Sequence, residues 1–476
     1  MHFLNNAHLS FSSNILLWQL PLNHFRNQHR HFSSSSSEPK TSDKEKDLKG
    51  DIKALDKRLW NFMLTIFGAI LTSVVGPYIY DRYYSANPDS EDSELEVLSS
   101  LQNVHPVEAE RYFDREQFSA TQLNKFYDIG IEAVSQGKLA VITLAGGQSS
   151  RLGSSLPKGI ISLGTGLETE NDSLLFLQAS QISYIQQKAK GKITWLIMTS
   201  KSTDEKIRQH LDIILKKTNL DWKQVIVFVQ NEIPAHDVDG KPLLSSPNQL
   251  VTSPDGDGGI YQAILPLLPK LEQNGIEYFH VYCADNILCR VPDLHMIGCA
   301  IDKKADCVLK VIEKKNPSEK IGHVCVEDGK IKVLNYSDIP KDMAEKRDPK
   351  FPEKLLFRAG NIANHFFTLD FLKKACFEFD SLPFHEVRKR IPFWDPGYGK
   401  NIEPIGENGI KKERFISDAF VHAKNFMVWQ VPREDEFSPL KNSNSEGVDF
   451  LSTCVRDFDF HGDMIKEMVK EFCKKK

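Results

Sequence analysis

From Lys138 onward, short apolar runs alternate with longer amphipathic runs, and this alternation constrains the fold more than any other feature of the chain. The strand-like runs are 138–144, 193–200, 224–230 and 277–286, and the helix-like runs are 174–188, 203–217 and 258–268. Such alternation is typical of a mainly parallel sheet with helices on both faces. Because ligands bind at the carboxyl ends of the strands in such sheets, we expect the chemistry to lie directly after these runs.

Composition narrows the class of protein. The chain has 476 residues, with 41% hydrophobic and 26% charged residues, which is typical of a folded protein of one large or two to three ordinary domains. Its net charge of −4 gives no basic field that would attract a nucleic acid. All eight cysteines lie after residue 282 and none forms a C-x-x-C pair, so we interpret them as reduced thiols.

The N-terminal part differs from the rest. Residues 1–58 are predicted to be a disordered or targeting segment, because the first 37 residues lack Asp and Glu and end in five serines. Residues 59–81 are predicted to be a transmembrane helix, since no charged residue occurs from Trp60 to Tyr80 and about 20 apolar residues span a bilayer core. A buried helix of the globular domain is the alternative. If residues 60–80 are a membrane anchor, the protein is associated with an organelle membrane. If they are a buried helix, a cytoplasmic location is expected, and both locations stay open.

The remaining chain divides into three parts. Residues 82–137 are predicted to form a linker and N-terminal helices, because the first part is acidic and polar and the second has apolar residues near helical spacing. Residues 138–442 are predicted to be the catalytic domain. Residues 443–476 are predicted to be a C-terminal helical tail, with Ile465, Val469 and Phe472 at helical spacing. The oligomeric state does not follow from the sequence.

The strongest local signal is the segment 144–159, LAGGQSSRLGSSLPKG, which directly follows a predicted strand. Gly146 and Gly147 allow backbone N–H groups to approach a polyphosphate closely. Arg151 and Lys158 bring two positive charges into the same loop. The segment is neither a G-x-x-x-x-G-K-[ST] loop nor a G-x-G-x-x-G fingerprint. An ordinary connection rich in small residues is the alternative reading.

This loop resembles the L-A-G-G-x-x-x-R-L-G-x-x-x-P-K-G signature of the UDP-sugar pyrophosphorylases. Five further segments resemble the eukaryotic UDP-N-acetylglucosamine pyrophosphorylases, in the expected order: 253–259, 280–288, 359–367, 409–415 and 433–442. The resemblance covers about 101–442 and implies an α/β nucleotide-diphospho-sugar transferase fold. This fold is Rossmann-like, with a mixed, mainly parallel sheet flanked by helices and a helical N-terminal extension. The family's long β-rich tail after S-P-L-K-N has no counterpart here.

The resemblance also implies a reaction, in which UTP and an N-acetylhexosamine 1-phosphate give pyrophosphate and UDP-N-acetylglucosamine or UDP-N-acetylgalactosamine. The implied catalytic residues are Arg151, Lys158 and Lys441. The implied nucleotide-binding residues are Leu144, Ala145, Gly146, Gly147, Gln230, Gly256 and Asp285. The implied sugar-phosphate-binding residues are Asp257, Asn335, Tyr336, Asn361 and Lys411. Asp285 would also bind Mg²⁺ or Mn²⁺.

The chemistry of this reaction agrees with these residue types. A sugar 1-phosphate oxygen is already a nucleophile, so in-line attack on the α-phosphorus needs no general base. The reaction instead needs positioning and neutralisation of spreading negative charge. Lys, Arg, backbone amides and a hard divalent cation supply both.

Three departures from the family pattern leave alternatives open. Ser149 and Ser150 replace Gly and Thr of the family loop, and Ser149 would strain the loop if its position needs a positive φ. Asp257 replaces an asparagine and Asn335 a glutamate, both on the inferred sugar side. A UDP-sugar pyrophosphorylase of another sugar specificity is therefore one alternative. A catalytically silent, membrane-tethered member of the fold is the other.

Overall fold

A computed structural model describes residues 103–167, 172–443 and 448–473. These residues belong to one compact unit, Leu95–Lys476. Both the predicted disordered or targeting segment 1–58 and the predicted transmembrane helix 59–81 lie outside the described residues. Among the residues that are described, no helix is long and apolar enough to cross a membrane.

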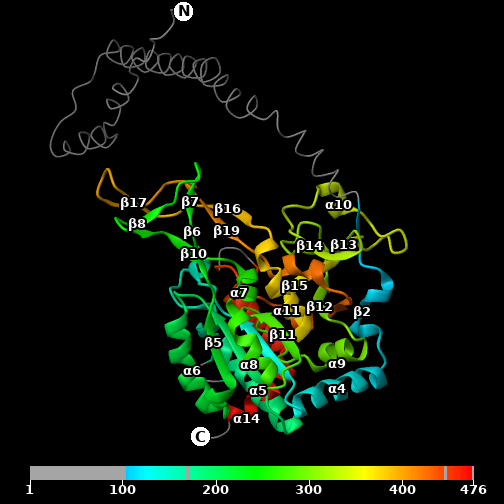
Figure 1. The fold of residues 1–476 in the computed structure, drawn as a ribbon. Helices are drawn as coiled ribbons and strands as arrows, with labels where there is room; N and C mark the ends of the chain where they lie inside the picture. Colours follow the sequence, from blue (N-terminus) through cyan, green and yellow to red (C-terminus); the bar gives the residue numbers. More distant parts are fainter. Residues whose placement is uncertain (1–102, 168–171, 444–447, 474–476) are drawn as a thin grey trace, which may run out of the picture. The chain divides into compact units, whose positions relative to one another are not determined.

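Within the described residues, eleven strands form a single mixed sheet (Figure 1). Its main path runs in the order β2 (Tyr112–Asp114), β20 (Phe426–Gln430), β12 (Cys307–Glu313), β15 (Ala359–Thr368), β11 (Tyr278–Cys283), β3 (Leu139–Leu144), β4 (Thr194–Thr199) and β5 (Val225–Val229). Neighbours on this path are parallel except at β15, which is antiparallel to β11 and β12. β13 (His323–Glu327) pairs with β15, β14 (Lys330–Leu334) and β1 (Val104–His105). The predicted fold, mixed and mainly parallel, is confirmed.

Helices cover both faces of this sheet and bury two apolar cores against it (Figure 1). One core includes α4 (Ala120–Ser135), α5 (Leu174–Ala189), α6 (Asp204–Thr218), α9 (Leu294–Asp302), α13 (Leu451–His461) and α14 (Asp463–Cys473). The other includes α7 (Ile260–Ile264), α8 (Leu268–Gln273) and α11 (Leu369–Phe377). The strands therefore read as continuous apolar runs because both of their faces are buried.

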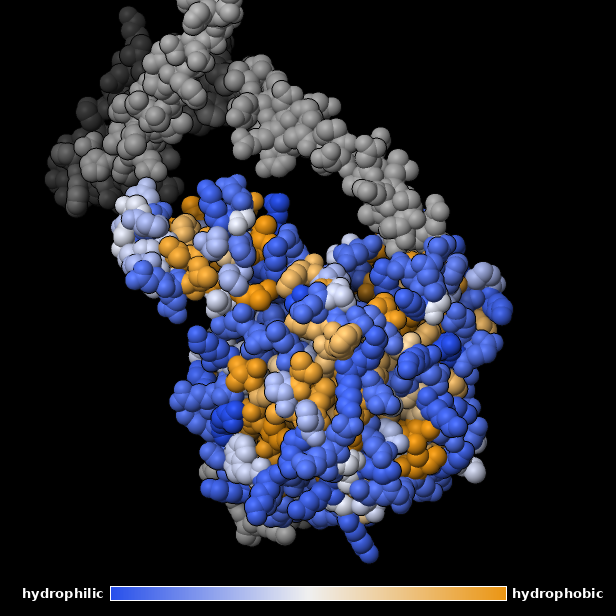
Figure 2. Space-filling model, in the orientation of Figure 1, coloured by the Kyte–Doolittle hydropathy of each residue, from blue (hydrophilic) through white to orange (hydrophobic). Residues whose placement is uncertain are grey.

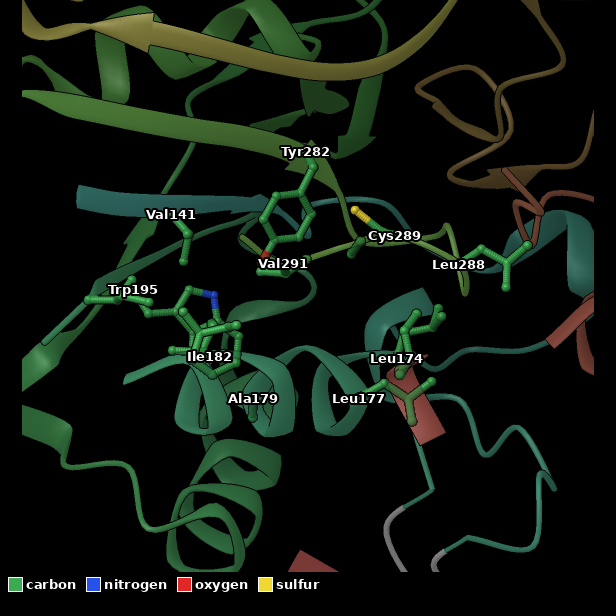
Figure 3. Close-up of a cluster of buried hydrophobic side chains, with 14 of the residues drawn as sticks. Val141, Leu174, Leu177, Ala179, Ile182, Trp195, Tyr282, Leu288, Cys289 and Val291 are labelled. Carbon is green, nitrogen blue, oxygen red and sulfur yellow. The ribbon is translucent and has the colours of Figure 1, made fainter. Parts of the chain in front are cut away.

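The core beneath α5 shows how the central strands are fixed. Ile182 of α5 lies beside Val141 of β3 and Trp195 of β4, and Leu174 and Leu177 lie toward Leu288 and Cys289, which follow β11 (Figure 3). Within this cluster Thr143 accepts a hydrogen bond from Trp195 Nε1 at 2.9 Å and donates one to the Tyr282 hydroxyl at 2.6 Å. The polar atoms of both large aromatic residues are thus satisfied without water.

The N-terminal part of the described chain departs from the predicted helices. α4 lies within the region predicted to be helical, but residues 104–105 and 112–114 are the strands β1 and β2. Phe118 stacks on Trp429 with ring centroids 5.7 Å apart, which ties this segment to β20. Strands of two or three residues have no period to detect, so tertiary packing decides their conformation. The described part of the predicted tail, 448–473, contains two helices, α13 and α14, which meet at Gly462.

Two hairpin regions form an arm that projects from the sheet, at the upper left of Figure 1. Its first half is β6 (Glu232–Pro234), β7 (His236–Asp237), β8 (Leu244–Ser246), β9 (Gln249–Leu250) and β10 (Thr252–Pro254). Its second half is β16 (His385–Lys389), β17 (Phe393–Asp395), β18 (Lys400–Ile402) and β19 (Gly409–Glu413). β19 pairs with β16 within the second half and with β7 of the first half, and the pairing with β7 joins the two halves. Apolar side chains gather on the arm in Figure 2. Val238, which follows β7, and Ile405, between β18 and β19, are among the exposed apolar residues.

Candidate active site

A pocket of about 550 Å³ opens at the carboxyl ends of β3 and β11. These strands are parallel neighbours, and Leu144 and Cys283 at their ends are paired in register. The glycine loop and Asp285 therefore leave the sheet side by side. Ten of the predicted residues line the pocket: Leu144, Ala145, Gly146, Gly147, Lys158, Gln230, Gly256, Asp257, Asp285 and Lys411.

One wall of the pocket depends on two glycines at close approaches. A Cβ atom on Gly146 would lie 2.1 Å from Gln230 Oε1, and one on Gly256 would lie 2.3 Å from the backbone oxygen of Arg414. Gly256 also has a φ of +92°, which side chains of L-residues rarely adopt. Ser200 Oγ donates to the Gly146 carbonyl at 2.9 Å, so the end of β4 supports the loop. The positive φ and the backbone contact require glycine at position 256, whereas a side chain at position 146 would have to displace the carboxamide of Gln230.

Gln230 connects this wall to the arm. Its Nε2 donates to Asp255 Oδ1 at 3.1 Å and to the Gly256 carbonyl at 3.0 Å. Burial raises the pKa of Asp255, and the hydrogen bond from Gln230 opposes that shift. Gln230 Oε1 accepts no hydrogen bond from the described residues, so an acceptor on this wall is left for a ligand.

The opposite wall carries charge. Lys158, in the short 3₁₀ helix η5 (Lys158–Ile160), lies 3.4 Å from Asp285, with Nζ facing the Oδ2 oxygen. Their side chains are 22% and 18% exposed, so both are accessible from the pocket. Lys411 and Glu413 enter the pocket from β19 of the arm. Two lysines and several carboxylates thus line the same pocket, and their opposite charges partly cancel. A polyanion or a cation that enters the pocket would change this charge balance.

Asp257 is a carboxylate of this wall whose surroundings shift its pKa from the ordinary value. Its Oδ1 accepts a hydrogen bond from the Ile416 amide at 2.9 Å. Burial raises the pKa of Asp257 to about 6; the bond from Ile416 opposes the rise, and the negative charges of Asp418 and Glu413 add to it. Asp257 therefore changes charge close to neutral pH, which an asparagine at this position would not do.

Five predicted residues do not line the pocket. Arg151 is exposed in η4 (Ser150–Leu152), and Tyr336 is 46% exposed after β14. Asn335 is half-buried beside Tyr336, and Asn361 of β15 accepts a hydrogen bond from the Ala363 amide at 3.1 Å. Lys441 lies over the Phe437 ring, 5.6 Å from its centroid.

Lys441 nevertheless acts on the pocket electrostatically. The thiol of Cys283, which lines the pocket, has its pKa raised well above the ordinary value by burial and by Asp285 and Asp257. The charges of Lys441 and Lys158 both oppose this rise. Sequence reasoning missed Cys283 and Glu413, although each lies inside a segment that was recognised, two residues from Asp285 and Lys411 respectively.

Ser149 does not strain the glycine loop. It is not among the residues with positive φ, so the conditional prediction of a strained loop does not apply. Its side chain is fully buried, and its hydroxyl has no hydrogen-bond partner among the described residues. The substitution of serine for glycine therefore leaves an unsatisfied polar group and not a distorted backbone.

Comparisons with known proteins agree with this geometry. Residues 82–472 match the family model of UTP–glucose-1-phosphate uridylyltransferase. The chain is 42% identical over 367 residues to the "Probable UDP-N-acetylglucosamine pyrophosphorylase" of Caenorhabditis elegans, covering 75% of each chain. It is 38% identical over 331 residues to the UDP-N-acetylglucosamine pyrophosphorylase of Saccharomyces cerevisiae, covering 67% of this chain and 68% of that one.

Solved structures give the same relation. A crystal structure of the uridine diphosphate N-acetylglucosamine pyrophosphorylase from Trypanosoma brucei superimposes with a TM-score of 0.68 at 27% identity, covering 77% of this chain and 74% of that one. The chain covers a smaller share of some other curated relatives, such as 65% of the mouse UDP-N-acetylhexosamine pyrophosphorylase-like protein 1. The predicted resemblance and enzyme class are confirmed: the chain belongs to the UTP–glucose-1-phosphate uridylyltransferase family, as a nucleotidyltransferase of the UDP-N-acetylglucosamine pyrophosphorylase type.

Proposed function

We propose that this chain transfers a uridylyl group from UTP to an N-acetylhexosamine 1-phosphate, forming a UDP-N-acetylhexosamine and pyrophosphate. UDP-N-acetylglucosamine is the expected product, because the related proteins of worm and yeast bear that name. The observation that carries the proposal is the Lys158–Asp285 pair, which faces a glycine-lined pocket at the ends of two parallel strands.

The glycine wall is proposed to bind the nucleoside. Gln230 Nε2 donates hydrogen bonds to Asp255 and Gly256, and these bonds fix the orientation of its carboxamide. Its free Oε1 would accept a hydrogen bond from the N3–H group of uracil. Cytosine has no hydrogen at that nitrogen, so bound cytosine would leave Oε1 of Gln230 without a hydrogen bond. Such a site therefore discriminates against cytosine.

The charged wall is proposed to carry the reaction. An oxygen of the sugar phosphate attacks the α-phosphorus of UTP; the new P–O bond forms as the bond to the pyrophosphate oxygen breaks, and pyrophosphate leaves with its electrons. Lys158 would neutralise charge on the phosphates, and Lys441 would act from the neighbouring segment. Arg151, which is exposed beside the loop, would join them on the bound triphosphate.

The residues present suit a divalent cation that arrives with its nucleotide. In the part of the chain that the structure describes, no group of three or more His, Cys, Asp or Glu side chains could hold a metal ion. Mg²⁺ commonly binds through one or two carboxylates plus substrate phosphates, and Asp285 offers an accessible carboxylate in the pocket. When bound, Mg²⁺ or Mn²⁺ would act as a Lewis acid that withdraws charge from the phosphates.

The sugar specificity rests on less support than the reaction. Asp257 and Lys411 line the pocket, whereas Asn335, Tyr336 and Asn361 do not. Asp257 and Asn335 are also the two departures from the family pattern on this side. A UDP-sugar pyrophosphorylase of another sugar specificity therefore remains the second proposal.

The deciding experiment measures pyrophosphate release by the full chain with UTP, Mg²⁺ and a panel of sugar 1-phosphates. Release with N-acetylglucosamine 1-phosphate, lost in Lys158→Ala, is the expected result. Release only with other sugars would keep the reaction and change the substrate. No release from a folded sample that binds UTP would overturn the proposal in favour of a catalytically silent protein.

A further inference from the structure

Two segments are tied together by hydrogen bonds, one carrying Asp285, the predicted nucleotide and metal ligand, and the other leading to Lys441, a predicted catalytic residue. Asn286, which is 7% exposed, donates from Nδ2 to the Glu436 carbonyl at 2.7 Å and accepts from the Ser438 amide at 2.9 Å. The Ile287 amide donates to the Ser438 carbonyl at 3.2 Å, and the Leu440 amide to the Asp285 carbonyl at 2.8 Å. Asp285 and Lys441 stand at the pocket end of this ladder.

The other end of the ladder is held by buried charges. Lys310, in the middle of β12, is fully buried, and its Nζ lies 2.6 Å from Asp293 Oδ2 and 2.5 Å from Glu436 Oε2. The second oxygen of Glu436 is 2.7 Å from Arg115 Nη1 of the N-terminal segment. Glu436 ends α12 (Arg433–Glu436), so this cluster anchors the start of the segment that leads to Lys441.

The cluster is held in its charged form. Burial alone would raise the pKa of Asp293, but Lys310 beside it holds that pKa well below its ordinary value. Burial would likewise lower the pKa of Lys310, and Asp293 and Glu436 together raise it. Removing one member would leave an uncompensated buried charge, which proteins relieve by moving backbone or admitting water.

We infer that Asn286 and the buried Lys310–Glu436 pair are positioning residues that set Asp285 and Lys441 against the reacting phosphates. This inference rests on the proposed function. None of the three residues lines the pocket, so they act only through the ladder. Displacement of Asp285 or Lys441 by about 1 Å would lower turnover up to about a hundredfold, because phosphoryl chemistry depends on alignment. The nucleoside wall lies on other elements and would be little affected.

The test compares Asn286→Ala, Lys310→Met and Glu436→Gln in the full chain with Leu372→Ala as a matched control. Leu372 is fully buried in α11, which follows β15. The carboxyl end of β15 pairs with the amino end of β11, away from the pocket, so truncation of Leu372 should destabilise the fold without reaching the ladder. Amide hydrogen exchange and steady-state kinetics are measured on each folded protein. Exchange at Ile287 and Leu440 should rise about tenfold or more in the three variants and not in the control.

In the kinetic measurement we expect kcat to fall between about tenfold and a hundredfold, with KM for UTP changed less than about threefold. Asn286→Asp should fall in between, because it keeps the acceptor for Ser438 and loses the donor to Glu436. If Lys310→Met does not fold, Asn286→Ala decides, since it leaves the ion cluster intact.

The inference is overturned if exchange at Leu440, or kcat in an active enzyme, changes no more than in Leu372→Ala. A wild-type chain that gives no pyrophosphate with any sugar would contradict the proposed function instead. The exchange measurement would still decide whether the ladder and the ion cluster act as one unit.

Discussion

On the glycine side of the pocket (Gly146, Gln230, Asp255 and Gly256), steric fit decides: a side chain at position 256 would meet the backbone, and one at position 146 would displace Gln230. The charged side (Lys158, Asp257, Asp285, Lys411 and Glu413) is instead held by a balance of opposite charges. Steric exclusion acts over tenths of an ångström and hardly depends on solution conditions. A charge balance extends over several ångströms and changes with pH, salt and ligand. Substitutions on the two sides should therefore be distinguishable by which kinetic constant they change.

The largest effect is expected from Lys158→Ala on the charged side. This change removes the cation 3.4 Å from Asp285 and leaves that carboxylate to repel the triphosphate. We expect kcat to fall about 10²-fold to 10³-fold, as for loss of one preorganised electrostatic contact. Pyrophosphate release is the measurement, and Lys125→Ala is the control, because Lys125 is a 61% exposed lysine paired with Asp302. A kcat within threefold of the wild type would remove Lys158 from the mechanism.

Gly146→Ala should give the next largest effect, and it should change KM for UTP rather than kcat. The new methyl group would force Gln230 away from its contacts with Asp255 and Gly256. Since Gln230 belongs to the nucleoside wall, KM for UTP should rise about tenfold, equivalent to one or two lost hydrogen bonds. Gly406→Ala is the matched control, because a Cβ there would meet no atom within 4 Å. If Gly146→Ala lowered kcat and left KM for UTP unchanged, the two sides of the pocket could not be told apart by their kinetic constants.

A smaller effect is expected from Asp257→Asn, and it should depend on pH. With a pKa of about 6, Asp257 is mostly neutral below pH 6 and charged above it, where it repels the sugar phosphate. The ratio of the wild-type KM for the sugar phosphate to that of Asp257→Asn should rise from about 1 at pH 5 to about threefold to tenfold at pH 7.5.

The substrate's own ionisation cancels in that ratio, because both enzymes meet the same substrate. A ratio that stays flat with pH would mean that Asp257 does not face the sugar phosphate. A ratio below 1 at high pH would mean that the carboxylate accepts hydrogen bonds from the sugar and helps to bind it.

The same contrast shows what could be read from the sequence. The β3 loop and Asp285 were predictable because apolar periodicity locates the ends of β3 and β11, where parallel strands bring their loops together. β1 and β2 were not, since two or three residues show no period. The pairing of Lys310 with Glu436 joins residues 126 positions apart, and nothing local marks either as buried. Asp257 was identified from its motif, but its raised pKa arises from burial in the folded chain and from the charges of Asp418 and Glu413, which the motif does not show.

The smallest effect is expected at Ser149, where serine replaces the family's glycine. Because its φ is not positive, Ser149→Gly relieves no strain, and kcat should stay within about twofold. Restoring glycine removes a buried hydroxyl without a partner, worth about 1 to 3 kcal/mol, but adds about 0.5 to 1 kcal/mol of backbone entropy cost. Ser149→Ala removes the hydroxyl without that cost and should be the more stable variant in urea unfolding. If Ser149→Gly instead raised kcat tenfold, the serine would be straining the backbone of the loop after all. Steric fit would then limit turnover at a position outside the glycine side of the pocket.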